Sequence, residues 1–130
     1  MATVKRFEEL ELWQKARMFC RNIFRITNYV KFSQDFRLKD QIRASSGSIM
    51  DNIAEGFERS GNKEFVQFLY IAKGSCGESR SQLYRALDFE YLPNDEFGLL
   101  QQEAIDLSQN ISNFIKYLKN SEMKGYKYNH

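Results

Sequence analysis

The sequence predicts an all-α fold, a left-handed, antiparallel four-helix bundle with up-down-up-down topology. Helix-breaking residues are scarce, because the 130-residue chain contains one proline and seven glycines, and this scarcity favours long helices over strands. Apolar residues also recur at alternating spacings of three and four along four segments, which is the heptad rhythm of packed helices. Because the connections between these segments are short, we expect a single domain over residues 1–130.

The first two helices are predicted at residues 9–29 and 37–58. The inward stripe of the first helix is predicted to contain Trp13, Ala16, Cys20, Ile23, Thr27 and Val30. The inward stripe of the second is predicted to contain Leu38, Ile42, Ser45, Ile49, Asn52 and Gly56. Residues 30–35 are interpreted as a connector, in which Ser33 or Asp35 can cap the second helix with a side-chain oxygen.

The third and fourth helices are predicted at residues 63–91 and 95–120. The stripe of the third contains Phe65, Leu69, Ala72, Cys76, Ser79, Leu83 and Ala86. The stripe of the fourth contains Phe97, Leu100, Ala104, Leu107, Ile111, Phe114 and Leu118. Pro93 ends the third helix, because a proline disfavours helical geometry in the residue before it. Residues 121–130 are predicted to be a mobile polar tail.

Small residues interrupt the second and third helices. Gly47 lies among Ser45, Ser46 and Ser48, and Gly74 lies in a similar setting on the third helix. A glycine inside a helix costs ~1 kcal/mol relative to alanine, whereas small residues on two facing helices allow their backbones to approach closely. We therefore predict that Gly47, Gly74 or both lie at a close contact between the second and third helices.

The composition indicates a globular protein of the cytoplasm, with no membrane association. Hydrophobic residues make up 42% of the chain and charged residues 28%, which is ordinary for a soluble domain. No apolar run approaches the ~18 residues needed to cross a bilayer, and the first residues lack the apolar region of a secretory signal. Cys20 and Cys76 both fall on predicted apolar faces, which favours buried thiols over a disulfide.

Charged residues are distributed unevenly, although the formal net charge is only +2. The charged residues between positions 12 and 34 are all basic, and those between positions 86 and 115 are all acidic. This asymmetry indicates either pairing of two helices within the bundle or docking between subunits. Aromatic residues, 15% of the chain, exceed what the stripes require and indicate a subunit interface or coverage of the bundle ends.

Several motifs in order along the chain resemble one known family. They are residues 7–16 (Phe-Glu-Glu-Leu-Glu-Leu-Trp-Gln-Lys-Ala), Leu38 with residues 41–45, residues 48–57 (Ser-Ile-Met-Asp-Asn-Ile-Ala-Glu-Gly-Phe) with Arg59, and the pairs that continue to Glu78. These motifs are similar to those of the bacterial proteins encoded in intervening sequences of the 23S ribosomal RNA gene, which are sometimes labelled ribosomal proteins. The resemblance covers residues 7–118, and Met50 departs from it where a proline is common.

This resemblance implies a four-helix bundle that assembles into a homopentamer, and it implies an association with RNA only loosely. The number five comes from the resemblance and not from spacing or composition. The residues themselves supply a reason to associate, since a basic segment and an acidic segment on one subunit suit a head-to-tail interface that closes into a ring.

The residues needed for catalysis or metal binding are missing from the predicted core. The only histidine is His130, in the tail, so neither a Glu-x-x-His metal site nor a histidine base for a serine nucleophile is available. Residues 74–77, Gly-Ser-Cys-Gly, lack the Gly-Lys-Ser/Thr of a phosphate-binding loop. We expect no enzyme activity, no metal and no cofactor.

Glu55 and Glu78 could face inward and join Asn52 in a buried polar network. Such a network would satisfy the serine hydroxyls and fix the register of the helices. The predicted structural signature consists of Gly47, Asn52, Glu55, Gly56, Gly74 and Glu78.

Basic residues supply the candidate nucleic-acid contacts. Arg17, Arg21 and Arg25 recur every four residues on one face of the first helix, where they could contact phosphates without reading sequence. The alternative is a solvated face or ion pairs with the acidic first half of the fourth helix. Further candidates near the turn after the second helix are Arg43, Arg59 and Lys63, with Arg80 beside them, and Tyr126 and Tyr128 of the tail could stack on bases.

The leading hypothesis is a non-enzymatic, homo-oligomeric bundle that acts as an RNA-associated or assembly accessory protein. The partners in this hypothesis are further copies of the chain and structured RNA. The alternative is a protein-interaction scaffold, such as an accessory subunit of a nucleic-acid enzyme, with a protein partner and no direct role in binding RNA.

Overall fold

The computed structural model describes residues 4–123, and this part of the chain is all-α. The four long helices are α1 (Glu11–Thr27), α3 (Phe36–Glu58), α4 (Asn62–Asp88) and α5 (Asn94–Met123). A 3-10 turn, η1 (Phe7–Glu9), precedes α1, and a short helix, α2 (Val30–Gln34), lies between α1 and α3. The prediction of an all-α fold is therefore confirmed, and residues 124–130 of the predicted tail lie outside the described residues.

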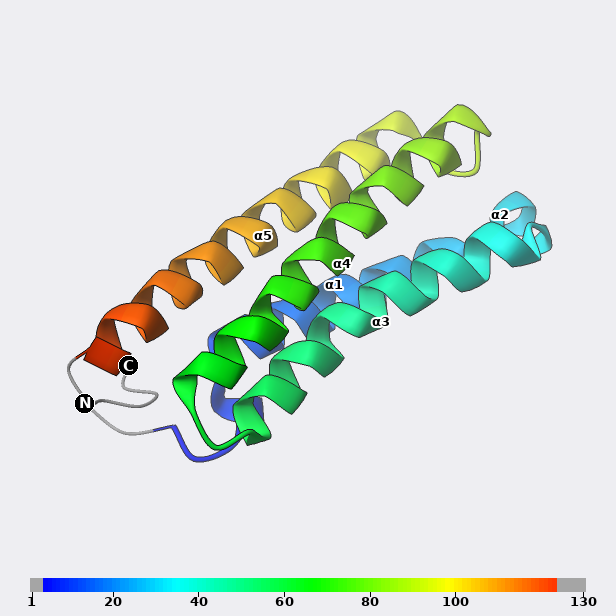
Figure 1. Ribbon diagram of the computed structural model, residues 1–130. Coiled ribbons are helices and arrows are strands. Elements are labelled where there is room, and N and C mark those ends of the chain that lie inside the picture. Colours follow the sequence, from blue (N-terminus) through cyan, green and yellow to red (C-terminus); the bar gives the residue numbers. More distant parts are fainter. Residues whose placement is uncertain (1–3, 124–130) are drawn as a thin grey trace.

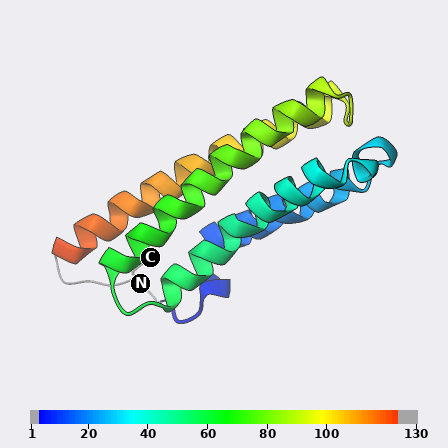
Figure 2. The ribbon, with the colours of Figure 1, turned by 45° about the vertical axis from the view of Figure 1, so that its right-hand side comes forward.

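The four long helices lie side by side along their lengths (Figure 1 and Figure 2). α1 packs against α3 and α5, and α4 also packs against α3 and α5. α1 and α3 are joined through α2 at one end of the molecule, whereas the turn between α3 and α4 lies at the opposite end (Figure 1). Within the described residues, no helix is long and apolar enough to span a membrane.

The core is one continuous cluster to which all four long helices contribute. On α4, all seven residues of the predicted stripe are buried, and most of the predicted stripes on α3 and α5 are buried as well. The largest fully buried side chains are Phe19, Phe32, Phe65, Leu10, Ile23, Ile26, Leu38, Ile42, Ile49, Ile53, Leu69 and Leu83. The buried stripes of α3, α4 and α5 support the predicted helical periodicity of three of the four long helices.

On α1 the buried stripe is displaced from the predicted one. The buried residues are Leu12, Ala16, Phe19, Ile23, Ile26 and Thr27. Trp13 and Cys20, which were predicted to face inward, are only half-buried, and Val30 is 76% exposed. Val30 points outward because α1 ends at Thr27 and Val30 begins α2.

The connector predicted at residues 30–35 contains α2, and its last residue caps α3. Asp35 accepts a hydrogen bond from the backbone N–H of Leu38 at 3.0 Å and another from the hydroxyl of Tyr91 at 2.8 Å. These two donors stabilise the carboxylate and lower the pKa of Asp35. α4 ends at Asp88, earlier than predicted, because Glu90 has a left-handed backbone conformation with φ of 61°.

The close approach between α3 and α4 occurs at Gly56. A Cβ atom at Gly56 would lie 2.7 Å from Cβ of Phe68 and 2.8 Å from Cδ1 of Phe65. A Cβ atom at Gly47 or Gly74 would meet no heavy atom of another part of the described chain within 4 Å. The prediction of a close contact at Gly47 or Gly74 is therefore wrong. The reason is orientation: Gly74 faces solvent, and Gly47 lies half-buried beside open space.

Candidate nucleic-acid interface

Neutral side chains form the buried and half-buried polar contacts between α3 and α4, while Arg85 of α4 donates to Gln41 of α3 at 3.2 Å on the exposed side. Ser45 Oγ lies 2.7 Å from Ser79 Oγ and donates to Gln82 Oε1 at 2.7 Å. Farther along, Ser48 Oγ lies 2.9 Å from Ser75 Oγ. Because uncharged groups satisfy these hydroxyls, no ionised side chain is needed between the two helices.

This arrangement corrects part of the predicted polar network. Asn52 is half-buried and donates to both the carbonyl and the hydroxyl oxygen of Ser48, at 2.8 and 2.9 Å. Glu55 and Glu78 are exposed, so the prediction that they face inward is wrong. Glu55 instead pairs with Arg59 at 3.1 Å, which keeps its carboxylate in water and avoids the cost of burying a charge.

The described residues contain no group of three or more side chains that could hold a metal ion. Cys76 is buried between α4 and α5, where its thiol donates to the carbonyl of Ala104 at 3.1 Å. Burial raises the pKa of Cys76 to about 11, so the reactive thiolate is scarce at neutral pH. His130 lies outside the described residues.

Arg43 is held in a fixed position beside α1. Its Nε atom donates to Thr27 Oγ1 at 2.8 Å and its Nη2 atom donates to Asn28 Oδ1 at 3.3 Å. The guanidinium also lies over the ring of Phe24, 4.2 Å from the centroid. Arg43 forms no ion pair with a carboxylate of the described chain, so its partners are neutral and its charge remains available to an anion.

A hollow of about 410 Å³ lies next to this arginine, between α1 and α3. Its lining residues are Arg17, Cys20, Arg21, Phe24 and Met50, and we refer to it as the Phe24 hollow. Phe24 is 53% exposed. Arg17 and Arg21 are exposed, and neither forms an ion pair within the described chain. Two predicted basic residues therefore border the hollow, and a third, Arg43, lies over one face of the Phe24 ring.

The remaining predicted basic residues do not join this site. Arg25 forms an ion pair with Glu96 at 3.5 Å and donates to the Tyr29 hydroxyl at 2.8 Å. At the opposite end of α3, Arg59 pairs with Glu55 and lies 3.9 Å from Glu64. Ion pairs of this kind reduce the charge that these arginines present to phosphate.

The predicted grouping of Arg43 with Arg59 and Lys63 is wrong. Arg43 contacts the C-terminal end of α1, while Lys63 is an exposed residue of the first turn of α4, at the other end of α3. Arg80 donates to Gln101 on α5 at 3.0 Å and lies at neither place. The grouping was wrong because it was based on positions in the sequence, whereas Arg43 and Lys63 lie near opposite ends of α3 in the fold.

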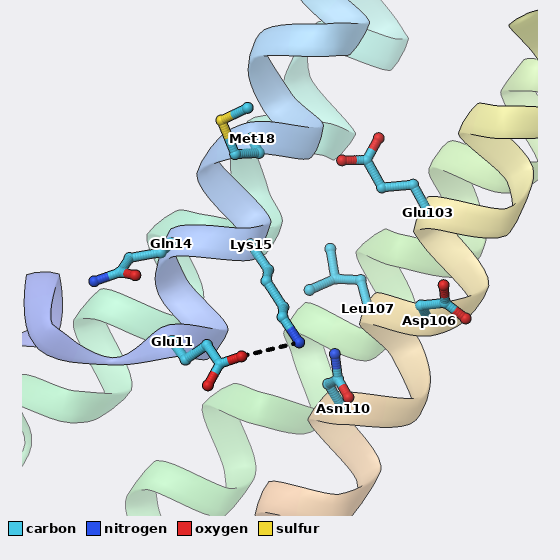
Figure 3. Close-up of a pocket in the computed structure, with 8 residues that line it drawn as sticks. All are labelled: Glu11, Gln14, Lys15, Met18, Glu103, Asp106, Leu107 and Asn110. Atoms are coloured by element: carbon cyan, nitrogen blue, oxygen red, sulfur yellow. Dashed lines mark ion pairs between the residues drawn. The ribbon is translucent and has the colours of Figure 1, made fainter.

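A second groove, between α1 and α5, has the opposite charge. Its volume is about 370 Å³, and it is lined by Glu11, Gln14, Lys15, Met18, Glu103, Asp106, Leu107 and Asn110. Figure 3 shows the acidic side chains of α1 and α5 around it, with Lys15 directed toward Glu11, at 3.3 Å. Three carboxylates and one ammonium disfavour a polyanion here, so the α1–α3 side is the better candidate for nucleic acid.

The sequence model of the 23S rRNA-intervening sequence protein family matches residues 8–113 of this chain. The chain belongs to this family. A solved structure from Bacteroides thetaiotaomicron, described as a protein with unknown function from the S23 ribosomal protein family, has the same fold. It is 21% identical, with a TM-score of 0.73, and the match covers 81% of this chain and 98% of that one. Comparison with curated proteins gives no match.

In this member of the intervening-sequence family, Phe24 belongs to the site but was not predicted from the sequence. It follows Arg17 by seven residues and Arg21 by three, so all three lie on one face of α1. The sequence alone therefore indicates that an aromatic residue lies on the same face of α1 as these two arginines. Only the folded chain shows that Arg43 of α3 lies on its ring.

Proposed function

We propose that this protein is a non-enzymatic, homo-oligomeric member of the intervening-sequence family that associates with RNA. In this proposal the fold is a left-handed, up-down-up-down antiparallel bundle, and RNA binds on the α1–α3 side. One observation supports the RNA association. The guanidinium of Arg43 is held in place by neutral partners and lies near Arg17 and Arg21.

Phosphate is the anion that suits these three arginines. A guanidinium offers several donors in a planar fork, which matches the oxygens of phosphate. Arg43 uses some of its donors on Thr27 and Asn28, so it is already oriented before any ligand arrives and loses little side-chain freedom on binding. RNA presents a row of phosphates and can occupy several arginines at once.

Replacing these three arginines by glutamine tests the RNA association. The variant R17Q/R21Q/R43Q should bind a structured ribosomal RNA fragment roughly 10-fold or more weakly in fluorescence anisotropy, since charge-assisted hydrogen bonds exceed neutral ones in strength. The matched control is R37Q/R59Q/K63Q, which also removes three positive charges, and we expect its affinity to stay close to that of the wild type. An equal loss of RNA affinity in both variants would show that the affinity depends only on the net charge of the protein.

The outer face of α4 supports association between copies of the chain. Tyr70, Gly74, Gly77, Ser81 and Tyr84 are spaced by four, three, four and three residues and are all exposed; we call this row the α4 seam. A Cβ atom at Gly74 or Gly77 would meet nothing within 4 Å. Each glycine costs the helix ~1 kcal/mol relative to alanine, and no close contact with residues 4–123 offsets this cost.

A neighbouring subunit at the α4 seam would give these glycines a structural role. Small residues at heptad spacing allow a second helix to approach closely, while Tyr70 and Tyr84 supply the aromatic contacts typical of interfaces. The proposed assembly is a head-to-tail ring, for which the sequence resemblance to the family suggests five subunits. Leu99 and Ile105, exposed on α5, are further apolar residues available to an interface.

Enlarging the glycines of the α4 seam tests the proposed assembly. We expect wild-type protein to show a mass several times the 15.4 kDa of one chain in light scattering, and G74L/G77L to shift toward the mass of one chain. Gly98 is an exposed glycine on α5 with no heavy atom near its Cβ position, so G98L is the control and should keep the wild-type mass. A wild-type monomer at micromolar concentration would contradict the assembly.

The acidic groove between α1 and α5 favours a second candidate function, that of a scaffold for a basic protein partner. Glu11, Glu103 and Asp106 line it, and this charge suits a lysine- or arginine-rich segment. Co-purification with the tagged protein separates the two functions. Recovery of one protein partner after nuclease treatment would favour the scaffold, whereas loss of all partners after nuclease treatment would favour RNA.

A further inference from the structure

We infer that the Phe24 hollow is a subsite for one unpaired nucleotide of single-stranded RNA, with its base against Phe24 and its phosphates on Arg17 and Arg21. This inference rests on the proposed RNA association and adds to it the kind of RNA and the place of contact. The hollow, at about 410 Å³, lies within the usual range for small-molecule sites.

An aromatic ring between arginines is suited to a base rather than to phosphate alone. Phe24 is half-exposed, and the Arg43 guanidinium lies 4.2 Å from its ring centroid. Bases stack on both aromatic rings and guanidinium planes, and every base has such a face, so the contact tolerates any sequence. Arg17 and Arg21 supply the cations that a base-stacking site requires for the flanking phosphates.

Gly47 lies on α3 one turn before Met50, which lines the hollow. On α3 it follows Arg43 by four residues and precedes Met50 by three, so the three residues lie on one face. A Cβ atom at Gly47 would meet no heavy atom within 4 Å. In this proposal a larger residue at position 47 extends toward the space that Met50 and Cys20 border.

A base that is paired in a duplex cannot enter this hollow, because its faces are stacked on neighbouring bases. Unpaired bases in loops, bulges and single strands can be turned outward and stacked on protein side chains. The subsite therefore predicts that the protein prefers single-stranded RNA to a duplex of the same length, although the duplex carries twice as many phosphates.

Two substitutions that keep every charge test the subsite. Phe24→Leu removes the stacking surface, and Gly47→Leu is designed to fill the hollow. Each substitution should weaken binding of a 12-nucleotide oligouridylate roughly 5-fold or more, as expected for the loss of one stacked base. Phe36→Leu is the control for Phe24, because Phe36 is also exposed and carries Lys39 over its ring at 4.9 Å. G98L is the control for Gly47→Leu. Both controls should bind as the wild type does, and thermal melting should show that all four variants are folded.

The possible outcomes separate the subsite from the proposed function. In the first outcome, F24L and G47L bind oligouridylate as tightly as the wild type, while R17Q/R21Q/R43Q binds it weakly. The protein then contacts only the phosphates, so the subsite is wrong and the RNA association stands. Equal affinity for a 12-base-pair duplex would also overturn the subsite. If the wild type binds no RNA at low salt, both the subsite and the RNA association are wrong.

Discussion

Replacing Phe19 by alanine is expected to lower the free energy of unfolding by about 3–5 kcal/mol, the usual cost of removing a buried phenylalanine side chain. Phe19 is fully buried in the core and lies on the inner face of α1. Its loss leaves a cavity that the surrounding helices can fill only in part. Urea denaturation at a fixed protein concentration measures the effect.

The neighbouring residue provides the control for Phe19. Cys20 is half-buried and borders the Phe24 hollow, so Cys20→Ala should cost about 1 kcal/mol or less, in line with the small apolar area removed. The sequence pattern alone places Cys20 on the inner face of the helix. A larger loss for Cys20→Ala than for Phe19→Ala would show that the inner face of α1 is the one that contains Cys20.

Replacing Gly56 by alanine is expected to destabilise the protein, by about 1–3 kcal/mol, although alanine is the better helix former. The new Cβ atom would lie 2.7 Å from Cβ of Phe68. Because that atom is fixed to the backbone of α4, the two helices must separate to relieve the overlap. Thermal or chemical denaturation would report the loss.

Gly47→Ala is the matched control and should have the opposite sign. The space around its Cβ position is open, so alanine should raise the free energy of unfolding by about 0.5–1 kcal/mol through its higher helix propensity. Destabilisation by Gly47→Ala together with no effect of Gly56→Ala would place the close helix contact at the position predicted from the sequence and refute its placement at Gly56.

The helices were predictable because periodicity and breakers are local properties of the sequence. The α4 stripe was correct over seven residues, from Phe65 to Ala86, and Asp35, one of the two predicted caps, does cap α3. The α1 stripe was ambiguous, since Ala16 and Ile23 belong to both possible faces. The neighbouring pair Phe19 and Cys20 is apolar throughout, so the spacing could not decide which residue faces inward.

The position of a glycine in the fold was not predictable from its neighbours. Gly47 and Gly56 both lie in α3, Gly47 among serines and Gly56 between Glu55 and Phe57. Whether a second helix approaches each one depends on how α3 and α4 cross and rotate, and neither property is encoded locally. The same limit explains Glu55, whose carboxylate reaches solvent and pairs with Arg59.

The candidate site was predictable only in part. Arg17 and Arg21 followed from their spacing on one helix, which is a local feature. Arg43 was assigned to the wrong end of α3, because its contacts with Thr27 and Asn28 depend on how α1 and α3 lie against each other. Phe24 required the same information, since its significance comes from the guanidinium that covers its ring.

The salt dependence of RNA affinity tests the central claim most directly. For single-stranded RNA, each phosphate neutralised contributes ~0.7 to the slope of log affinity against log salt concentration, so R17Q/R21Q/R43Q should reduce the slope by about 2 relative to the wild type. The variant R37Q/R59Q/K63Q should keep the wild-type slope. Equal slopes for the wild type and R17Q/R21Q/R43Q would contradict the claim that these three arginines contact RNA phosphates.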